Sequence, residues 1–131
     1  MTTPTQELEQ EIKSCGADVA PRITPDIIEA NIASEHYFLA ADVVAGGAAA
    51  EMYAESDIGK MVPVTGVVVP ISLELLTFCV LVLKNGFTVT GESACASPEN
   101  FNAEIGRKVA RQNAVSKIWP LMGYALKEAL L

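Results

Sequence analysis

Hydrophobic and polar residues change their spacing most clearly between residues 75 and 92. The 75–83 run is apolar at successive positions, whereas the 87–92 run alternates apolar and polar residues. The first pattern is typical of a central strand, and the second of a strand with one exposed face. Between them stands Asn85-Gly86, the dipeptide that two-residue hairpin turns favour. The pattern predicts a β-hairpin over about 76–92.

The length of this turn sets the pairing of the two strands. With two residues in the loop, Lys84 pairs with Phe87, and Val82 lies opposite Val89. An isolated hairpin is only marginally stable in water, so the sheet needs a third strand.

Two segments could supply the third strand. One is the segment at Tyr37, and the other is the valine-rich 63–72 tract, which its prolines restrict to a sheet edge or an extended connection. The variable 43–73 tract is the least clear part of the chain, because its alanines favour a helix that Gly46-Gly47 would split. The pattern leaves the choice of third strand open.

A long helix is predicted after the hairpin. Ser97-Pro98-Glu99 places a capping residue, a proline and an acid in succession, as at the start of a helix. We expect a helix over about 98–119, a break or kink at Pro120, and a last helical segment over 121–131.

The predicted helix has three different faces. A large apolar face is expected to pack on the sheet and carries Phe101, Ile105, Val109 and Trp119. A small face would let another helix approach closely and carries Ala103, Ala110 and Ala114. The third face is basic, with Arg107, Lys108 and Arg111.

Two shorter helices precede the sheet. Leu8, Ile12 and Cys15 recur at helical spacing, which predicts an N-terminal helix within 1–22 that is loosely attached. Thr24-Pro25-Asp26 begins a second helix that runs to about Ala33. Together these elements predict an α+β fold in a single domain over 1–131: a small antiparallel sheet built on the hairpin, packed by the long helix and flanked by the shorter ones.

Charge and composition exclude several classes of protein. The net charge of −7 argues against broad binding to nucleic acid, which draws its affinity from Lys and Arg. Cys15, Cys79 and Cys95 have no ligand-like spacing, so neither a disulfide framework nor a metal site is predicted. The apolar 61–83 region is interrupted by prolines and an acid, so no membrane span is expected.

Two segments carry a resemblance to a known family: ITPDIIEANIASEHYF near the start, and GFTVTGESACASPENFNAEIGRKVARQNAVSKIWPLMGY. They resemble a family of short tailed-phage and prophage proteins of unknown function. The resemblance spans most of the chain except about 43–73. It implies a virus-encoded protein made in the host bacterial cytoplasm, and it brings no agreed activity, cofactor or catalytic residue.

The sharpest candidate for chemistry is Cys95, between a strand end and a helix start. A helix N-terminus lowers a thiol pKa and attracts anions, so Cys95 could be a nucleophile, with His36 as its base, or could line a pocket. A packed, unreactive cysteine is the simpler interpretation, and His36 then packs or hydrogen-bonds beside Tyr37. Glu35 and Glu92 could form an acid–base pair, although solvated carboxylates are favoured.

The basic helix face is the second candidate. Arg107, Lys108 and Arg111 could bind a phosphate, with Trp119 or Tyr124 as a stacking surface. Against this, Glu104 lies one turn before Lys108 and neutralises part of the face, so a solvated face is favoured.

We therefore expect a phage or prophage accessory protein that is not an enzyme and acts by binding a host protein or a small host metabolite such as a nucleotide signal. Homo-oligomers are expected, because the small face and the apolar Leu121, Met122 and Leu126 permit close packing. The expected ligand-binding residues are Glu92, Ser93, Cys95, Asn100, Arg107, Arg111, Trp119 and Tyr124.

No catalytic residue, metal or cofactor is expected. Two alternatives stay open: a small thiol-dependent enzyme that uses Cys95, and a nucleic-acid-binding protein that uses the Arg107/Arg111 helix face.

Overall fold

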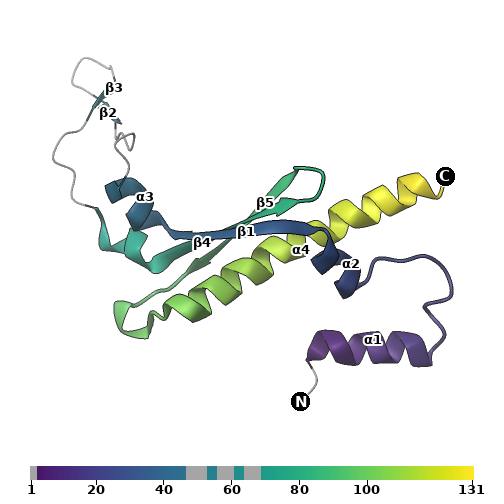
Figure 1. Ribbon diagram of the computed structural model, residues 1–131. Coiled ribbons are helices and arrows are strands. Elements are labelled where there is room, and N and C mark those ends of the chain that lie inside the picture. Colours follow the sequence, from purple (N-terminus) through teal and green to yellow (C-terminus); the bar gives the residue numbers. More distant parts are fainter. Residues whose placement is uncertain (1–2, 47–52, 56–60, 64–68) are drawn as a thin grey trace.

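A three-stranded antiparallel sheet and one long helix form the centre of the protein (Figure 1). The computed structural model describes residues 3–46, 53–55, 61–63 and 69–131. The strand order is β1-β4-β5, with β1 at Ile32–Leu39, β4 at Leu76–Leu83 and β5 at Thr88–Ala94. Helix α4, Ala103–Ala129, runs along one face of this sheet (Figure 1). The α+β prediction is confirmed.

Shorter elements flank this centre. They are α1 (Pro4–Ser14), α2 (Pro25–Ala30), α3 (Ala40–Gly46) and the 3-10 turns η1 (Ile71–Leu75) and η2 (Pro98–Asn100). Two short strands, β2 (Tyr53–Glu55) and β3 (Met61–Pro63), pair with each other in a separate sheet.

The third strand of the main sheet comes from the segment that contains Tyr37. Strand β1 pairs with β4, so β4 is central, as its apolar faces predicted. Of the valine-rich alternative, residues 64–68 lie outside the described part of the chain. The predicted second helix is too long, because α2 ends at Ala30 and β1 begins at Ile32.

The hairpin register differs from the prediction by one residue. Val82 lies opposite Thr88, not Val89, because the loop has three residues and Leu83 pairs with Phe87. The Gly86 N–H donates to the Leu83 carbonyl, and Gly86 has a φ of +88°, as in a turn that ends with a left-handed residue.

The long helix begins later than predicted. Ser97-Pro98-Glu99 starts the short turn η2, whereas α4 is capped by Asn102, whose side chain accepts a hydrogen bond from the Ile105 N–H at 3.1 Å. The helix also continues through Pro120 without ending, so of the two predicted outcomes the break is wrong, and the kink stays a prediction. Proline removes one intrahelical hydrogen bond there, and the residues on both sides remain helical.

The faces of α4 are the reverse of the prediction. Four residues of the helix are buried. Three of them are small, Gly106, Ala110 and Ala114, and the fourth is Ile118. Of the predicted apolar face, Ile105 is 60% exposed and Val109 is 38% exposed. The small residues let the helix backbone approach β5, where a Cβ atom on Gly91 would lie 2.2 Å from the Ala110 carbonyl oxygen.

The N-terminal helix is joined to the rest by an ion pair. Helix α1 forms where predicted, and none of its described residues is buried. Glu9 on this helix binds Arg22, which lies just before α2. Whether 1–131 behaves as a single domain, with 1–22 loosely attached, stays a prediction.

Candidate functional site

The turn between β5 and α4 encloses a small cavity, here called the turn cavity, of about 160 Å³. Three of the expected ligand-binding residues line it: Ser93, Cys95 and Asn100. The other lining residues are Leu75, Thr77, Ala94, Phe101, Asn102, Ile105 and Gly106. The structure therefore brings these three predicted residues together at the N-terminal end of α4.

Within the turn cavity, both polar groups of Cys95 that face neighbouring backbone are hydrogen-bonded, whereas the Thr77 hydroxyl is not bonded to any described atom. The Cys95 thiol donates to the Ser97 carbonyl at 3.2 Å, and the Cys95 N–H donates to the Leu75 carbonyl at 3.0 Å. Thr77 is only 3% exposed, and its hydroxyl has no hydrogen-bond partner among the described protein atoms.

Cys95 and His36 are not brought together. Cys95 lies on the side of the sheet that α4 covers, since Gly106 of the helix shares its cavity. The neighbours of His36 in β1, Glu35 and Tyr37, point to that covered side, so His36 points to the opposite side, where its Nε2 lies 3.0 Å from the Ser34 hydroxyl. The proposed thiol–imidazole pair is therefore absent from this arrangement.

Arg111 joins three elements through its guanidinium group. It donates to both carboxylate oxygens of Glu29 in α2, at 3.0 and 2.7 Å, and to Glu35 in β1 at 2.9 Å. Tyr37 donates to the other oxygen of Glu35 at 3.1 Å. This arrangement satisfies Arg111, so the residue acts as a tie between α2, β1 and α4.

The same cluster shifts the titration of its members. The bond from Arg111 holds the pKa of Glu29 below its ordinary value and raises the pKa of Arg111 itself. Burial and the bond to Glu35 raise the pKa of Tyr37 to about 12. Two carboxylates surround one guanidinium, so the cluster offers no unpaired positive charge to an anion.

The remaining predicted residues do not converge. Arg107 lines a separate cavity of about 180 Å³ with Tyr37 and Asp42. Lys108 lies 3.5 Å from Glu104 on the exposed helix surface, so the predicted neutralisation is confirmed. Glu92 belongs to the opposite side of the sheet from Glu35, so the alternative of an acid–base pair does not hold in this arrangement.

The two predicted stacking residues also differ in their surroundings. Trp119 is half-buried and packs against the core, whereas Tyr124 is 71% exposed. The anion site expected from Arg107, Lys108 and Arg111 is therefore not assembled among the described side chains. What these residues bind, if anything, stays a prediction.

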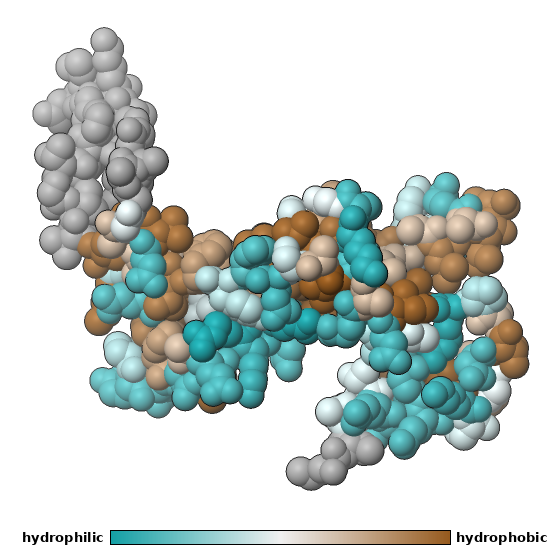
Figure 2. Space-filling model, in the orientation of Figure 1, coloured by the Kyte–Doolittle hydropathy of each residue, from teal (hydrophilic) through white to brown (hydrophobic). Residues whose placement is uncertain are grey.

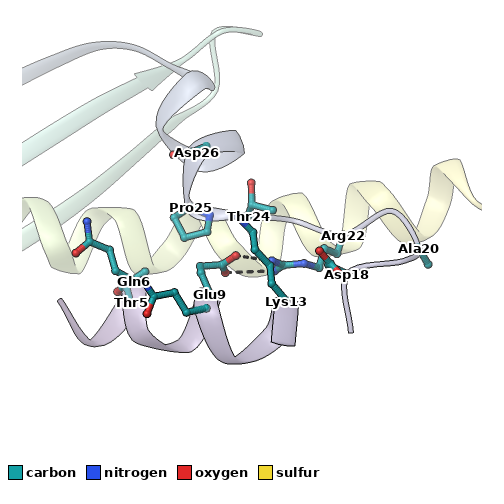
Figure 3. Close-up of a pocket in the computed structure, with 11 residues that line it drawn as sticks. Thr5, Gln6, Glu9, Lys13, Asp18, Ala20, Arg22, Thr24, Pro25 and Asp26 are labelled. Carbon is teal, nitrogen blue, oxygen red and sulfur yellow. Dashed lines mark hydrogen bonds and ion pairs between the residues drawn. The ribbon is translucent and has the colours of Figure 1, made fainter. Parts of the chain in front are cut away.

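Apart from a concavity of about 440 Å³ beside α3, two larger concavities were not predicted from the sequence. One, of about 690 Å³, lies between α1 and the segment before α2, where Glu9 and Arg22 point toward each other (Figure 3). The other, here called the apolar groove, measures about 520 Å³ and lies between α2, the hairpin loop and the C-terminal part of α4. It is lined by Ile27, Ala30, Asn31, Leu83, Lys84, Asn85, Phe87, Leu121, Met122 and Ala125. In the sequence, the apolar residues Ile27 and Phe87 were the features that could have indicated the apolar groove.

The sheet also has an apolar face that α4 does not cover, here called the uncovered face. On the central strand β4, four half-buried residues point away from the helix: Leu76, Phe78, Val80 and Val82. Phe38 of β1 stacks on Phe78 with 5.2 Å between ring centroids. No described helix runs along this face (Figure 1). The sequence of β4 indicates an apolar residue at each position of this face, but it does not indicate whether another element covers the face.

Other features give no further site. Among the described residues, no group of three or more His, Cys, Asp or Glu side chains could hold a metal ion. No described helix is long and apolar enough to cross a membrane.

Comparison with known proteins identifies the family. Residues 23–130 match the model of the family described as phage protein (N4 Gp49/phage Sf6 gene 66). No curated protein and no solved structure matches the chain significantly. The matched region begins after α1 and includes the sheet, the turn cavity, the Arg111 cluster and all of α4. The chain therefore belongs to the phage protein (N4 Gp49/phage Sf6 gene 66) family.

Proposed function

We propose that this phage protein acts without catalysis, by binding a host protein on the uncovered face of its sheet. The observation that carries this proposal is the apolar surface of β4 that points away from α4. Strands that are apolar on both sides occur mainly in sheets that are covered on both sides. Here the described elements cover one side, so a second protein is the natural cover for the other.

The size of the uncovered face fits the centre of a protein interface. Three strands about 4.8 Å apart and eight residues at about 3.3 Å each give a face of roughly 14 by 26 Å. This is roughly half of the 800 Å² that each partner contributes to a standard interface. The stacked rings of Phe38 and Phe78 would be its central contact, because aromatic residues dominate binding energy.

Charge indicates the chemistry of the partner. The protein carries a net charge of −7, and Glu92 lies on the β5 side of the uncovered face. A partner with an apolar patch bordered by Lys and Arg would be attracted over a distance and would match this rim. A strongly acidic partner would be repelled.

The small-metabolite version of the hypothesis has less support at the cavities that the predicted residues line. The turn cavity and the Arg107 cavity, of about 160 and 180 Å³, are smaller than the roughly 300–1,000 Å³ of typical ligand pockets. The larger cavity beside α1 has three acidic lining residues, Glu9, Asp18 and Asp26. Its two basic ones are Lys13 and Arg22, and Arg22 is already paired, so the lining disfavours an anionic nucleotide.

The two alternatives lose support for different reasons. No residue that lines the turn cavity is a base that could activate Cys95. The nucleic-acid alternative needs Arg111, whose guanidinium already binds Glu29 and Glu35.

The test is a binding experiment with matched variants. The full chain would be used to capture proteins from lysate of the bacterial host, and each captured protein would be purified and titrated against it by calorimetry. We expect Phe38→Glu and Val80→Glu to weaken binding at least tenfold, and Val109→Glu, on the helix at the opposite side, to leave it unchanged. Far-UV circular dichroism would confirm that each variant is folded.

Two results would overturn the proposal. One is a partner whose affinity is the same for the wild type and for both sheet variants. The other is a small molecule that native mass spectrometry finds bound to the purified wild type and lost from a turn-cavity variant such as Asn100→Ala.

A further inference from the structure

One line of side chains at every fourth position runs along α4 and ends at the residue that follows the helix. It consists of Gly106, Ala110, Ala114, Ile118, Met122, Leu126 and Leu130. The first four are buried under the sheet, Met122 and Leu126 are half-buried, and Leu130 is 58% exposed. Met122 still packs against the edge of the core, so the line continues for about two turns past the part of the helix that the core covers.

The character of the line changes where the sheet ends. Under the sheet its residues are mostly small, and beyond the sheet they are large and apolar. Figure 1 shows the C-terminal part of α4 extending past the strands, and Figure 2 shows brown, hydrophobic residues around that end. Large apolar residues that the described elements cover only in part, on a helix that extends past the sheet, indicate a surface that another helix buries.

The apolar groove lies beside this extension. Its exposed walls include Phe87 at 55%, Ile27 at 41% and Leu121 at 41% exposure. Met122 belongs both to the groove and to the line. The groove and the line thus form one continuous apolar surface.

We infer that this surface binds a second copy of the same chain, with the two α4 helices crossing antiparallel at Leu126. The spacing is self-complementary, because Met122 and Leu130 each lie four residues, or about 6 Å along the helix, from Leu126. Met122 of each subunit then contacts Leu130 of the partner subunit. Ridges formed by every fourth residue on both helices pack in the commonest helix-crossing class.

Charge at the rim of the groove favours this occupant. Among the described residues that line the apolar groove, Lys84 is the only basic one. In the antiparallel crossing, the end of the partner's α4 reaches the groove, and the carbonyl groups of a helix C-terminus carry about half a negative charge. Each Lys84 then lies near the negative end of the other helix. This surface is separate from the uncovered face, so the inference does not depend on the proposed function.

The first test measures the mass of the full chain in solution. Sedimentation equilibrium at several concentrations should give the wild type a mass twice the 13.9 kDa of one chain. Leu126→Glu and Leu130→Glu should each raise the dimer dissociation constant at least tenfold. Val109→Glu places the same charge on the same helix away from the line and should leave the dimer intact. Leu130→Glu is the more informative variant if Leu126→Glu fails to fold, because Leu130 contributes little buried area to the monomer.

The second test traps the crossing point. In a Cys15→Ser background, Leu126→Cys should form a disulfide-linked dimer under mild oxidation, and Val109→Cys should not. A wild type that is monomeric at all concentrations would overturn the inference. So would an oligomer that both glutamate variants leave unchanged, or equal cross-linking at the two cysteine positions.

Discussion

Gly91 of β5 lies against the backbone of α4 at Ala110. A methyl group on Gly91 would come within 2.2 Å of the Ala110 carbonyl oxygen and 2.3 Å of the Ala114 nitrogen. Both are backbone atoms of a regular helix, and they cannot move aside as a flexible side chain can. The distance between the helix and the sheet therefore depends on the absence of a side chain at this position.

Gly91→Ala should be among the most destabilising substitutions in the chain. We expect a loss of about 3 kcal/mol or more in the free energy of unfolding, at the upper end for overpacked cores, because α4 must shift away from β5. Urea denaturation would measure it. Gly46→Ala is the control, since no atom lies within 4 Å of its Cβ position, and it should change stability by less than about 0.5 kcal/mol. Similar effects of the two substitutions would show that the close approach is wrong.

The tie formed by Arg111 gives a second prediction. Arg111→Met keeps the side-chain stem but removes the bonds to Glu29 and Glu35, and it should cost about 1–2 kcal/mol after allowance for the partial exposure of the cluster. Arg107→Met is the matched control, because Arg107 is exposed and forms no ion pair among the described residues. Its effect should be within about 0.5 kcal/mol. Equal losses in urea denaturation would mean that the tie contributes nothing.

The pH dependence of stability gives a third prediction. The pKa of Glu29 is lower in the folded protein than in the unfolded chain, because Arg111 bonds to its charged form. Its contribution is therefore complete above the unfolded value, near pH 4.3, and is lost as the pH falls through the lower folded value. The pKa values of Glu9 and Glu99 are also lowered in the folded protein. Acidification therefore reduces the stability of the wild type through more than one carboxylate.

Glu29→Gln isolates the contribution of this carboxylate. Chemical denaturation between pH 7 and pH 3 should show that the wild type is more stable than the variant at neutral pH, and that the difference shrinks as the solution is acidified. A difference that stays constant over this range would contradict a coupled Glu29–Arg111 pair.

The elements of the fold were predictable because their signals are local. The apolar faces of β4 and the dipeptide Asn85-Gly86 indicate the hairpin. The helical spacing of the apolar residues near the N-terminus indicates α1. The register of the hairpin could not be predicted, because two-residue and three-residue loops both accept a left-handed glycine at Gly86. In the structure the Asn85 side chain accepts a hydrogen bond from the Phe87 N–H at 2.9 Å and stabilises the longer loop.

The faces of α4 and the Arg111 cluster depend on contacts between distant residues. Large apolar side chains were expected to face the sheet, yet the small ones do, because Gly91 on another element lets the backbones approach. Glu29 lies 82 positions from Arg111, and no local pattern connects them. The residues of the turn cavity could be predicted as a group because Ser93, Cys95 and Asn100 are close in sequence.

The three cysteines give a last prediction, which also tests the thiol-enzyme alternative. Cys15 is exposed, Cys95 is half-buried, and Cys79 is fully buried, where burial raises its pKa. Labelling with a thiol reagent near neutral pH, followed by peptide mass spectrometry, should modify Cys15 first and Cys95 more slowly. Cys79 should react at least about a hundredfold more slowly than Cys15, because its exposure requires opening of the core. In denaturant all three should react at similar rates. If Cys95 reacted faster than Cys15 in the folded protein, its thiol would be activated. That result would favour the thiol-dependent enzyme over the non-catalytic proposal.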